Sequence, residues 1–272
     1  MTALIVSDEK IAGTSSKGNQ EKWYDSATGY WYKLDQFGYE ALAEALASAL
    51  LEKSNIEKDT PFTFVRYRME KLSVRGRERS GCASRNFLEP GQSLITVNRL
   101  LSSYLGAHLM QKLARLPSDT RRIAYLAEAT AEYTGLTEFP RYLTALFEVD
   151  ALFCNDDRHL NNIAVIKRAE AYCYCPIFDN AAGLLSNTQL SQMDIAPKAL
   201  IAQLRARPFY TTFTRQMNSA RRLYGKQIVM PVLTAAEISA AMQPLLEYYA
   251  ERDRGIIADR VSECILTRQK AL

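Results

Sequence analysis

The chain has 272 residues, 47% of them hydrophobic and 24% charged, and its formal net charge is +4. This is the composition of an ordinary globular protein, and the length allows two lobes or one large domain. The mild charge does not argue for nucleic-acid binding, so no direct binding is predicted. No apolar run reaches the roughly 18 residues that a membrane span requires. The first residues lack a signal-peptide pattern and the five cysteines are odd in number, so we expect reduced thiols in a cytoplasmic protein without membrane contact.

Residues 1–90 are expected to form a small β-rich lobe that binds a nucleotide. A short strand is predicted at residues 3–6. The segment that follows at residues 13–22, GTSSKGNQEK, can present backbone N–H groups and positive charge to phosphates. By its own pattern it matches no phosphate loop, so a flexible surface loop is the preferred interpretation from these residues alone.

A strand predicted at residues 31–34 follows an aromatic-rich stretch. Because side chains alternate along a strand, Lys33 faces the side opposite to Tyr32 and Leu34. In kinases, a strand lysine paired with a helix glutamate fixes the α- and β-phosphates of ATP. The strand therefore offers a candidate phosphate-binding lysine.

The helix predicted at residues 38–53 offers two partners for that lysine. Its apolar residues recur at helical spacing, and Glu40 and Glu44 lie one turn apart on a neighbouring face. Glu44 lies deeper in the helix and is slightly favoured over Glu40. A solvated acidic face is the alternative interpretation of both glutamates.

The rest of the first lobe is predicted to be β-structure that ends at a strong breaker. Alternating apolar and polar residues predict strands at 62–69 and 82–88, separated by an exposed turn at 75–79. The sequence Glu-Pro-Gly-Gln at 89–92 is the clearest interruption in the chain. We place the boundary between the lobes there, and a nucleotide would bind in the cleft between them.

Residues 91–272 are predicted to form a larger, mostly helical lobe. A β-hairpin in the middle of a helical region is unusual for an all-α protein, so the chain is assigned to the mixed α/β (α+β) class. Helices are expected at residues 95–116, 121–133, 140–153, 197–206, 211–224 and 235–269, the last broken near residues 254–255.

Basic residues gather in the second half of this lobe. A solvated helix face is the preferred interpretation of this cluster, and a docking surface for an acidic partner is the alternative. The cluster consists of Arg205, Arg207, Arg215, Arg221, Arg222 and Lys226.

The candidate chemistry lies between residues 154 and 183. An acidic loop with Asp157 and Asn162 leads into a predicted hairpin, and the second strand ends at Asp179. The hairpin brings Asp179 back beside the loop because paired strands lie about 5 Å apart. One carboxylate and one amide oxygen suit Mg²⁺, and a second carboxylate can orient an attacking hydroxyl. An acidic loop that caps a helix or lines a turn explains the spacing equally well.

These motifs resemble those of the HipA-like kinases. Residues 155–162, NDDRHLNN, and residues 176–180, PIFDN, match the family pattern D-R-H-x-x-N followed by P-[IL]-[FY]-D. Residues 18–22, GNQEK, are similar to the family's G-x-Q-E-K phosphate loop, which now favours that role over a surface loop. The resemblance runs from about residue 13 to at least residue 183. It implies a two-lobed protein-kinase-like fold, distantly similar to phosphatidylinositol kinases, with a β-rich N-lobe and a helical C-lobe that carries a catalytic β-hairpin.

The resemblance also implies roles for individual residues. Asp157 would be the catalytic base, Asn162 and Asp179 would hold Mg²⁺, and Lys33 would contact the phosphates of ATP. His159 is interpreted as a structural brace of the catalytic loop. The residues that would bind ATP, with the glutamate that pairs with the lysine, are Gly18, Asn19, Gln20, Lys22, Lys33 and Glu44.

Three features differ from the family or extend its pattern. Only about a dozen residues precede the phosphate loop, which predicts a short form without the extra N-terminal subdomain. Ala181 and Ala182 separate Asn180 from Gly183, where the family often has glycine directly after the asparagine. Ser15 or Ser16, just ahead of the loop, would be the site of autophosphorylation found in some family members.

The sequence thus predicts an ATP- and Mg²⁺-dependent phosphotransferase, most simply a serine/threonine protein kinase of the HipA-like class. A small-molecule or lipid kinase of the same fold and a non-catalytic ATP-binding regulator are the alternatives. The expected partners are a protein substrate and a small DNA-binding antitoxin, as in toxin–antitoxin systems.

Overall fold

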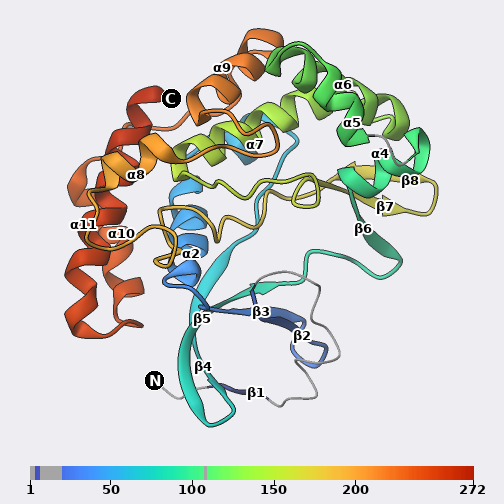
Figure 1. Ribbon diagram of the computed structural model, residues 1–272. Coiled ribbons are helices and arrows are strands. Elements are labelled where there is room, and N and C mark those ends of the chain that lie inside the picture. Colours follow the sequence, from blue (N-terminus) through green and yellow to red (C-terminus); the bar gives the residue numbers. More distant parts are fainter. Residues whose placement is uncertain (1–3, 7–19, 107–108) are drawn as a thin grey trace.

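Two β-sheets and a set of helices form the part of the chain that the computed structural model describes, which is residues 4–6, 20–106 and 109–272 (Figure 1). The predicted phosphate-loop residues Gly18 and Asn19, and the candidate phosphorylation sites Ser15 and Ser16, lie outside the described residues.

The first sheet has five strands in the order β1-β4-β5-β3-β2. β1 runs parallel to β4, and the other neighbouring strands are antiparallel. On one face, Trp23, Tyr32 and Leu34 pack in a small hydrophobic cluster with residues of β4 and β5. The prediction that Lys33 faces the other way is therefore confirmed. The strands are β1 (Leu4–Val6), β2 (Lys22–Asp25), β3 (Tyr30–Leu34), β4 (Tyr67–Val74) and β5 (Arg77–Arg85).

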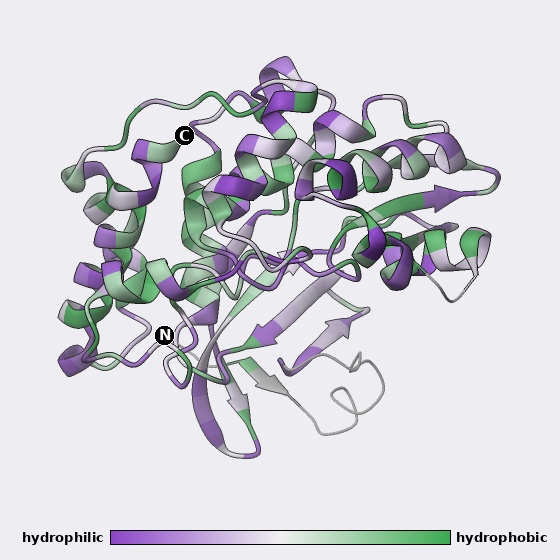
Figure 2. Cartoon of the chain, turned by 45° about the horizontal axis from the view of Figure 1, so that its top comes forward, coloured by the Kyte–Doolittle hydropathy of each residue, from purple (hydrophilic) through white to green (hydrophobic). Residues whose placement is uncertain are grey.

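The strand boundaries predicted for β4 and β5 were wrong in part. The strand expected at 62–69 begins only at Tyr67, because the preceding residues pair elsewhere. The N–H of Val65 donates to Ile177 at 2.9 Å, and the N–H of Ile177 donates to Thr63 at 2.7 Å. The expected turn shrinks to Arg75 and Gly76, both of which have positive φ. Figure 2 shows that the tip of this hairpin, which projects away from the helices, is mostly hydrophilic.

Helix α2 (Glu40–Leu51) lies between the first sheet and the C-terminal helices (Figure 1). Every residue of α2 except Ala49 is buried. The main hydrophobic core contains residues from α2, from the inner face of the sheet and from the helices that follow. A short helix, α3 (Ile56–Asp59), comes next. The division into lobes of residues 1–90 and 91–272 stays a prediction.

The second sheet has three antiparallel strands, β6 (Gln92–Thr96), β7 (Ala164–Arg168) and β8 (Ala171–Tyr174). β7 and β8 form the predicted hairpin, but β6 was missed because its pairing with β7 joins distant parts of the chain. The single helix expected at 95–116 is in fact β6 followed by α4 (Val97–Leu105) and α5 (Leu109–Arg115). The Thr96 side chain caps α4 by accepting the N–H of Arg99, and Gly106, with φ of 72°, ends it.

The remaining helices lie above the second sheet and beside α2, away from the tip of the β4–β5 hairpin (Figure 1). The break expected near residues 254–255 lies instead at 247–250, and Gly255 is inside α11. Among the described residues, no helix combines the length and the hydrophobicity needed to cross a membrane. The helices that follow α5 are α6 (Asp119–Thr134), α7 (Phe139–Phe153), α8 (Pro197–Gln203), α9 (Phe213–Tyr224), α10 (Ala235–Leu246) and α11 (Glu251–Arg268), and the 3₁₀ turn η1 (Gln269–Ala271) comes last.

Candidate active site

A buried ion cluster joins three segments that are far apart in the sequence. The Nζ of Lys33 on β3 lies 2.5 Å from Oε1 of Glu44 on α2 and 2.7 Å from Oδ1 of Asp179 after β8. Lys33 is 8% exposed, and Glu44 is fully buried. Glu40 accepts the backbone N–H groups of Phe37 and Gly38 instead, so Glu44 is the partner of Lys33.

Burial and neighbouring charges shift the pKa values of this cluster in opposite directions. Burial alone would lower the pKa of Lys33, but the carboxylates of Asp179 and Glu44 raise it well above its usual value. Burial likewise opposes ionisation of Asp179, yet Lys33 outweighs it, and the pKa of Asp179 is lowered. For Glu44, which has no solvent contact, burial prevails over Lys33 and raises the pKa. One cation thus serves two carboxylates, and its attraction outweighs the effect of burial on the pKa at Asp179 but not at Glu44.

Two further side chains complete the surroundings of Lys33. Lys22 lies opposite Lys33 in the β2–β3 ladder, and burial followed by repulsion from Lys33 lowers the pKa of Lys22. The ring of Tyr67 lies 5.3 Å from the Nζ of Lys33. Gln20, the first described residue of the predicted phosphate loop, donates through Nε2 to the carbonyl of Leu34 at 2.7 Å. This hydrogen bond holds the segment at 20–22 against the C-terminal end of β3, close to the ion cluster.

The loop after α7 presents Asp157 toward solvent. Its carboxylate, 47% exposed, lies 3.7 Å from Nη1 of Arg207 and 3.9 Å from Nε2 of His159. Nδ2 of Asn162 donates to the carbonyl of Asp157 at 3.0 Å. This bond fixes the amide of Asn162 and leaves its oxygen available, since no described residue donates to it.

Arg158 is the brace of this site, and the interpretation of His159 as the brace is wrong. Arg158 is 0% exposed, and its Nε and Nη2 donate to the buried carboxylate of Asp150 on α7 at 2.9 to 3.1 Å. Its Nη1 donates to the carbonyls of Asn162 and Phe178 at 3.1 and 2.6 Å. His159 is partly exposed, and its Nδ1 has no partner among the described residues. Arg158 therefore holds the loop with Asn162 against the loop with Asp179.

The loop after β8 is fixed by several neighbours at once. Asp179 has a φ of 63°, a conformation that residues other than glycine adopt rarely and that often marks functional sites. Asn180 donates its N–H to Oε2 of Glu44 at 2.8 Å, and its Oδ1 accepts from Nη2 of Arg158 at 2.9 Å. Asn155 donates through Nδ2 to the Asp179 carbonyl at 3.1 Å.

Gly183 allows two backbone segments to pack closely, although two alanines separate it from Asn180. A Cβ at this position would lie 2.9 Å from the carbonyl oxygens of both Asn180 and Phe153. No real Cβ fits comfortably so close to two backbone oxygens, so the chain requires glycine there. The two alanines therefore place the glycine later in the loop than the family pattern does, but a glycine is still required.

The oxygen atoms at this site fit Mg²⁺. Asp179 uses Oδ1 for Lys33 and keeps Oδ2, while Asn162 keeps its amide oxygen. Both are hard ligands, and Mg²⁺ usually takes only one or two protein oxygens and fills its shell with phosphate oxygens and water. The described residues contain no cluster of three or more His, Cys, Asp or Glu suited to a metal.

The sequence analysis placed Arg207 only in the basic cluster, and it did not find the contact of Arg207 with Asp157 or the role of Asp150. Arg207 lies in the connection between α8 and α9, and no local motif marks it. Asp150 did leave a signal, because an acidic residue within the apolar run of α7 requires a buried partner. Asp156 is a further titratable group at the site: burial, and then the charge of Asp157, raise its pKa to about 6, while Arg207 acts against this rise.

Comparison with known proteins agrees with this architecture at the level of structure. No protein-family model and no curated protein matches the sequence. The structure of the proinflammatory kinase CtkA of Helicobacter pylori matches with a TM-score of 0.60 and 14% identity, covering 94% of this chain and 92% of that one. HipA of Shewanella oneidensis MR-1, solved with HipB and operator DNA, matches with a TM-score of 0.47 and 12% identity, covering 93% of this chain and 64% of HipA.

The likeness to CtkA confirms the two-lobed, kinase-like fold that the resemblance to HipA-like kinases implied. Within this fold, the candidate site residues lie on the loops that follow α7 and β8 and on strand β3 and helix α2.

Proposed function

We propose that this protein is an ATP- and Mg²⁺-dependent phosphotransferase, specifically a serine/threonine protein kinase of the HipA-like class. The observation that carries the proposal is the buried Lys33, which joins Glu44 and Asp179 at 2.5 and 2.7 Å. Holding a lysine and a glutamate out of water is costly unless they serve each other or a ligand. A strand lysine held by a helix glutamate beside a metal-binding aspartate is the arrangement that positions ATP phosphates in kinases.

Each residue has a defined task in this proposal. Lys33 and Lys22 bind phosphate oxygens, and Glu44 keeps the Lys33 ammonium in place. Asp179 and Asn162 would hold Mg²⁺, which when bound supplies positive charge to the phosphate oxygens. Asp157, exposed toward solvent, orients the acceptor hydroxyl and accepts its proton. Arg158 fixes the two loops relative to each other, so the positions of Asp157 and Asp179 are set before substrates bind.

The test separates binding from phosphoryl transfer. Asp157→Asn should reduce the transfer of labelled γ-phosphate about 10²–10⁴-fold, the usual contribution of general-base assistance, while ATP affinity is retained. Asp179→Ala should weaken Mg²⁺-ATP binding itself. Asp194→Asn, a change of an exposed aspartate without any described contact, is the control. Full turnover in Asp157→Asn would show that the roles are assigned wrongly.

The acceptor is addressed by incubating the protein with cell lysate and labelled ATP. Labelled protein bands are expected for a protein kinase. Label confined to small molecules or lipids would favour the alternative kinase, and ATP binding without any turnover would favour a regulator. The predicted antitoxin partner rests on the sequence resemblance alone, and co-purification from the native host tests it.

A further inference from the structure

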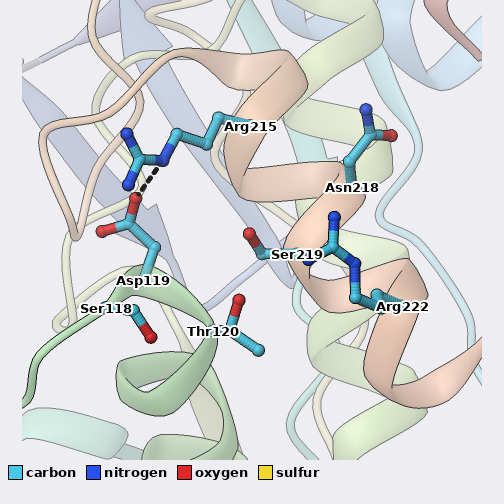
Figure 3. A pocket seen from close by; sticks show the side chains of 7 residues that line it. All are labelled: Ser118, Asp119, Thr120, Arg215, Asn218, Ser219 and Arg222. Atoms are coloured by element: carbon cyan, nitrogen blue, oxygen red, sulfur yellow. Dashed lines mark ion pairs between the residues drawn. The ribbon is translucent and has the colours of Figure 1, made fainter.

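A polar pocket of about 340 Å³ lies between the start of α6 and one face of α9, apart from the site described above (Figure 3). Pockets that bind uncharged organic ligands are mainly apolar, whereas every side chain that lines this one is polar or charged. The lining residues are Ser118, Asp119, Thr120, Arg215, Asn218, Ser219 and Arg222.

The hydroxyl of a mostly buried serine points into this pocket. Ser219 is 8% exposed, its oxygen is not shut off from solvent, and among the described residues nothing forms a hydrogen bond with its side chain. Figure 3 shows the oxygen directed from α9 toward the first turn of α6. A hydroxyl without a protein partner at the base of a pocket is available to a ligand or to ordered water.

The one acidic residue in the pocket is already neutralised. Asp119 accepts from Nε of Arg215 at 2.8 Å and from Nη1 of Arg122 at 3.2 Å. Arg222 is exposed and, within the part of the chain that the structure describes, has no ion-pair or hydrogen-bond partner. The two arginines and one aspartate that line the pocket leave a positive balance, so the pocket favours an anion.

The start of α6 adds donors to the same space. Ser118 caps the helix by accepting the N–H of Arg121, which leaves its own hydroxyl proton free to donate. Thr120 places a second hydroxyl in the first turn, where backbone N–H groups have no acceptor within the helix. The positive end of the helix dipole also favours negative charge here. Hydroxyl, guanidinium, amide and backbone donors thus surround one cavity.

We propose that this pocket binds the phosphate group of a phosphorylated serine or threonine on a peptide chain. A phosphate monoester carries about two negative charges at neutral pH and offers three strong acceptor oxygens, which matches a set of donors with net positive charge. The pocket is larger than a phosphate group, and it opens at the surface, which leaves room for the adjoining side chain and backbone. The proposal goes beyond the proposed kinase activity and does not depend on it.

The test measures binding in the absence of ATP. Fluorescence anisotropy of a short labelled phosphoserine peptide with neutral flanking residues is compared with that of its unphosphorylated form. The phosphorylated peptide should bind at least about tenfold more tightly, because its interactions with the pocket are charge-assisted. Arg222→Gln and Ser219→Ala should each weaken that binding several-fold. Arg121→Gln is the matched control, since it removes the same charge from α6 at an exposed position that does not line the pocket.

Four results would overturn the assignment. The first is equal binding of the phosphorylated and unphosphorylated peptides. The second is an equal effect of Arg121→Gln and Arg222→Gln, which would indicate general attraction to a basic surface. The third is wild-type binding by Ser219→Ala. The fourth is competition by inorganic phosphate at the concentration at which the peptide competes, which would define a site for free phosphate.

Discussion

The phenol of Tyr249 donates to Oδ2 of Asp35 at 2.7 Å, although 214 positions separate them in the chain. Oδ1 of Asp35 accepts the N–H of Ala41 in the first turn of α2 at 2.6 Å. Tyr249 belongs to the turn between α10 and α11 at residues 247–250, and the carbonyl of Tyr248 in the same turn accepts from Ser80 on β5 at 2.6 Å. The start of α2 is therefore anchored to the C-terminal helices through one carboxylate.

This carboxylate predicts a particular dependence of stability on pH. Burial raises the pKa of Asp35 to about 8, from the 3.8 expected for an exposed aspartate. Between these values the folded state binds more protons than the unfolded state, so the contribution of Asp35 to stability falls as pH rises, by at most about 1.4 kcal/mol per unit. Asp35→Asn keeps the shape and removes the titration. The melting temperature of the variant relative to wild type should therefore rise from pH 4 to pH 8.

Tyr249→Phe is the companion variant for this measurement. It removes a donor to Asp35 but leaves the titrating group in place, so the pH dependence of its stability should persist. Parallel pH profiles for wild type and Asp35→Asn would show that Asp35 is ionised in both the folded and unfolded states.

Replacing Arg158 should be costly because it leaves Asp150 buried without a partner. Arg158→Ala is expected to lower the free energy of unfolding by about 3–5 kcal/mol, the usual cost of breaking a buried ion pair. Arg168→Ala removes an exposed arginine that lies 3.5 Å from Glu89, and it should change stability by less than about 1 kcal/mol. Urea denaturation of both variants gives the comparison, and similar losses would mean that Arg158 is not the brace.

Arg207 should control the ionisation of the acidic loop. Its positive charge opposes the rise in the pKa of Asp156, so Arg207→Gln should move that pKa further above its present value of about 6. Carboxyl NMR titration follows the change directly. Arg205→Gln is the control, because the Arg205 side chain contacts only nearby backbone carbonyls. An unchanged pKa in Arg207→Gln would place Arg207 away from the loop in solution.

Two glycine-to-alanine changes should have opposite effects. A Cβ on Gly38 would lie 2.1 Å from the carbonyl oxygen of Ser186, so Gly38→Ala forces two backbone segments apart and should destabilise the protein by roughly 1–3 kcal/mol. Gly255 is exposed within α11, and a Cβ there would meet nothing within 4 Å. Gly255→Ala should stabilise by about 0.5–1 kcal/mol. Thermal unfolding of the two variants checks both signs, and a stabilised Gly38→Ala would contradict the close contact.

Local patterns placed several residues of the candidate site, whereas their roles came from the family resemblance. Strand alternation predicted that Lys33 faces away from the aromatic cluster, and position along the helix slightly favoured Glu44 over Glu40 as its partner. Asp157 and Asn162 are close in sequence, and the β7–β8 hairpin accounts for the return of Asp179. Each of these inferences depends on residues within a single turn, strand or helix, and the sequence alone shows their spacing.

Contacts between distant segments could not be predicted in the same way. The pairing of Arg158 with Asp150 depends on how a loop folds against α7, and Tyr249 reaches Asp35 only after the C-terminal helices pack. The glycine at 255 suggested a helix break, but an exposed helix tolerates glycine at modest cost, and the chain turns at 247–250 without one. β6 was missed because a short strand is defined by its partner rather than by its own residues.

The burial of α2 on nearly every side limits how the protein could be switched off. In many enzymes a helix with one wet face can rotate outward and withdraw its glutamate at little cost. Here Leu42, Leu46 and Leu50 are all fully buried, and outward rotation would expose them to water, each at roughly 1.5–3 kcal/mol. Glu44 is thus held in place by the apolar packing of its own helix, which opposes any displacement of that carboxylate.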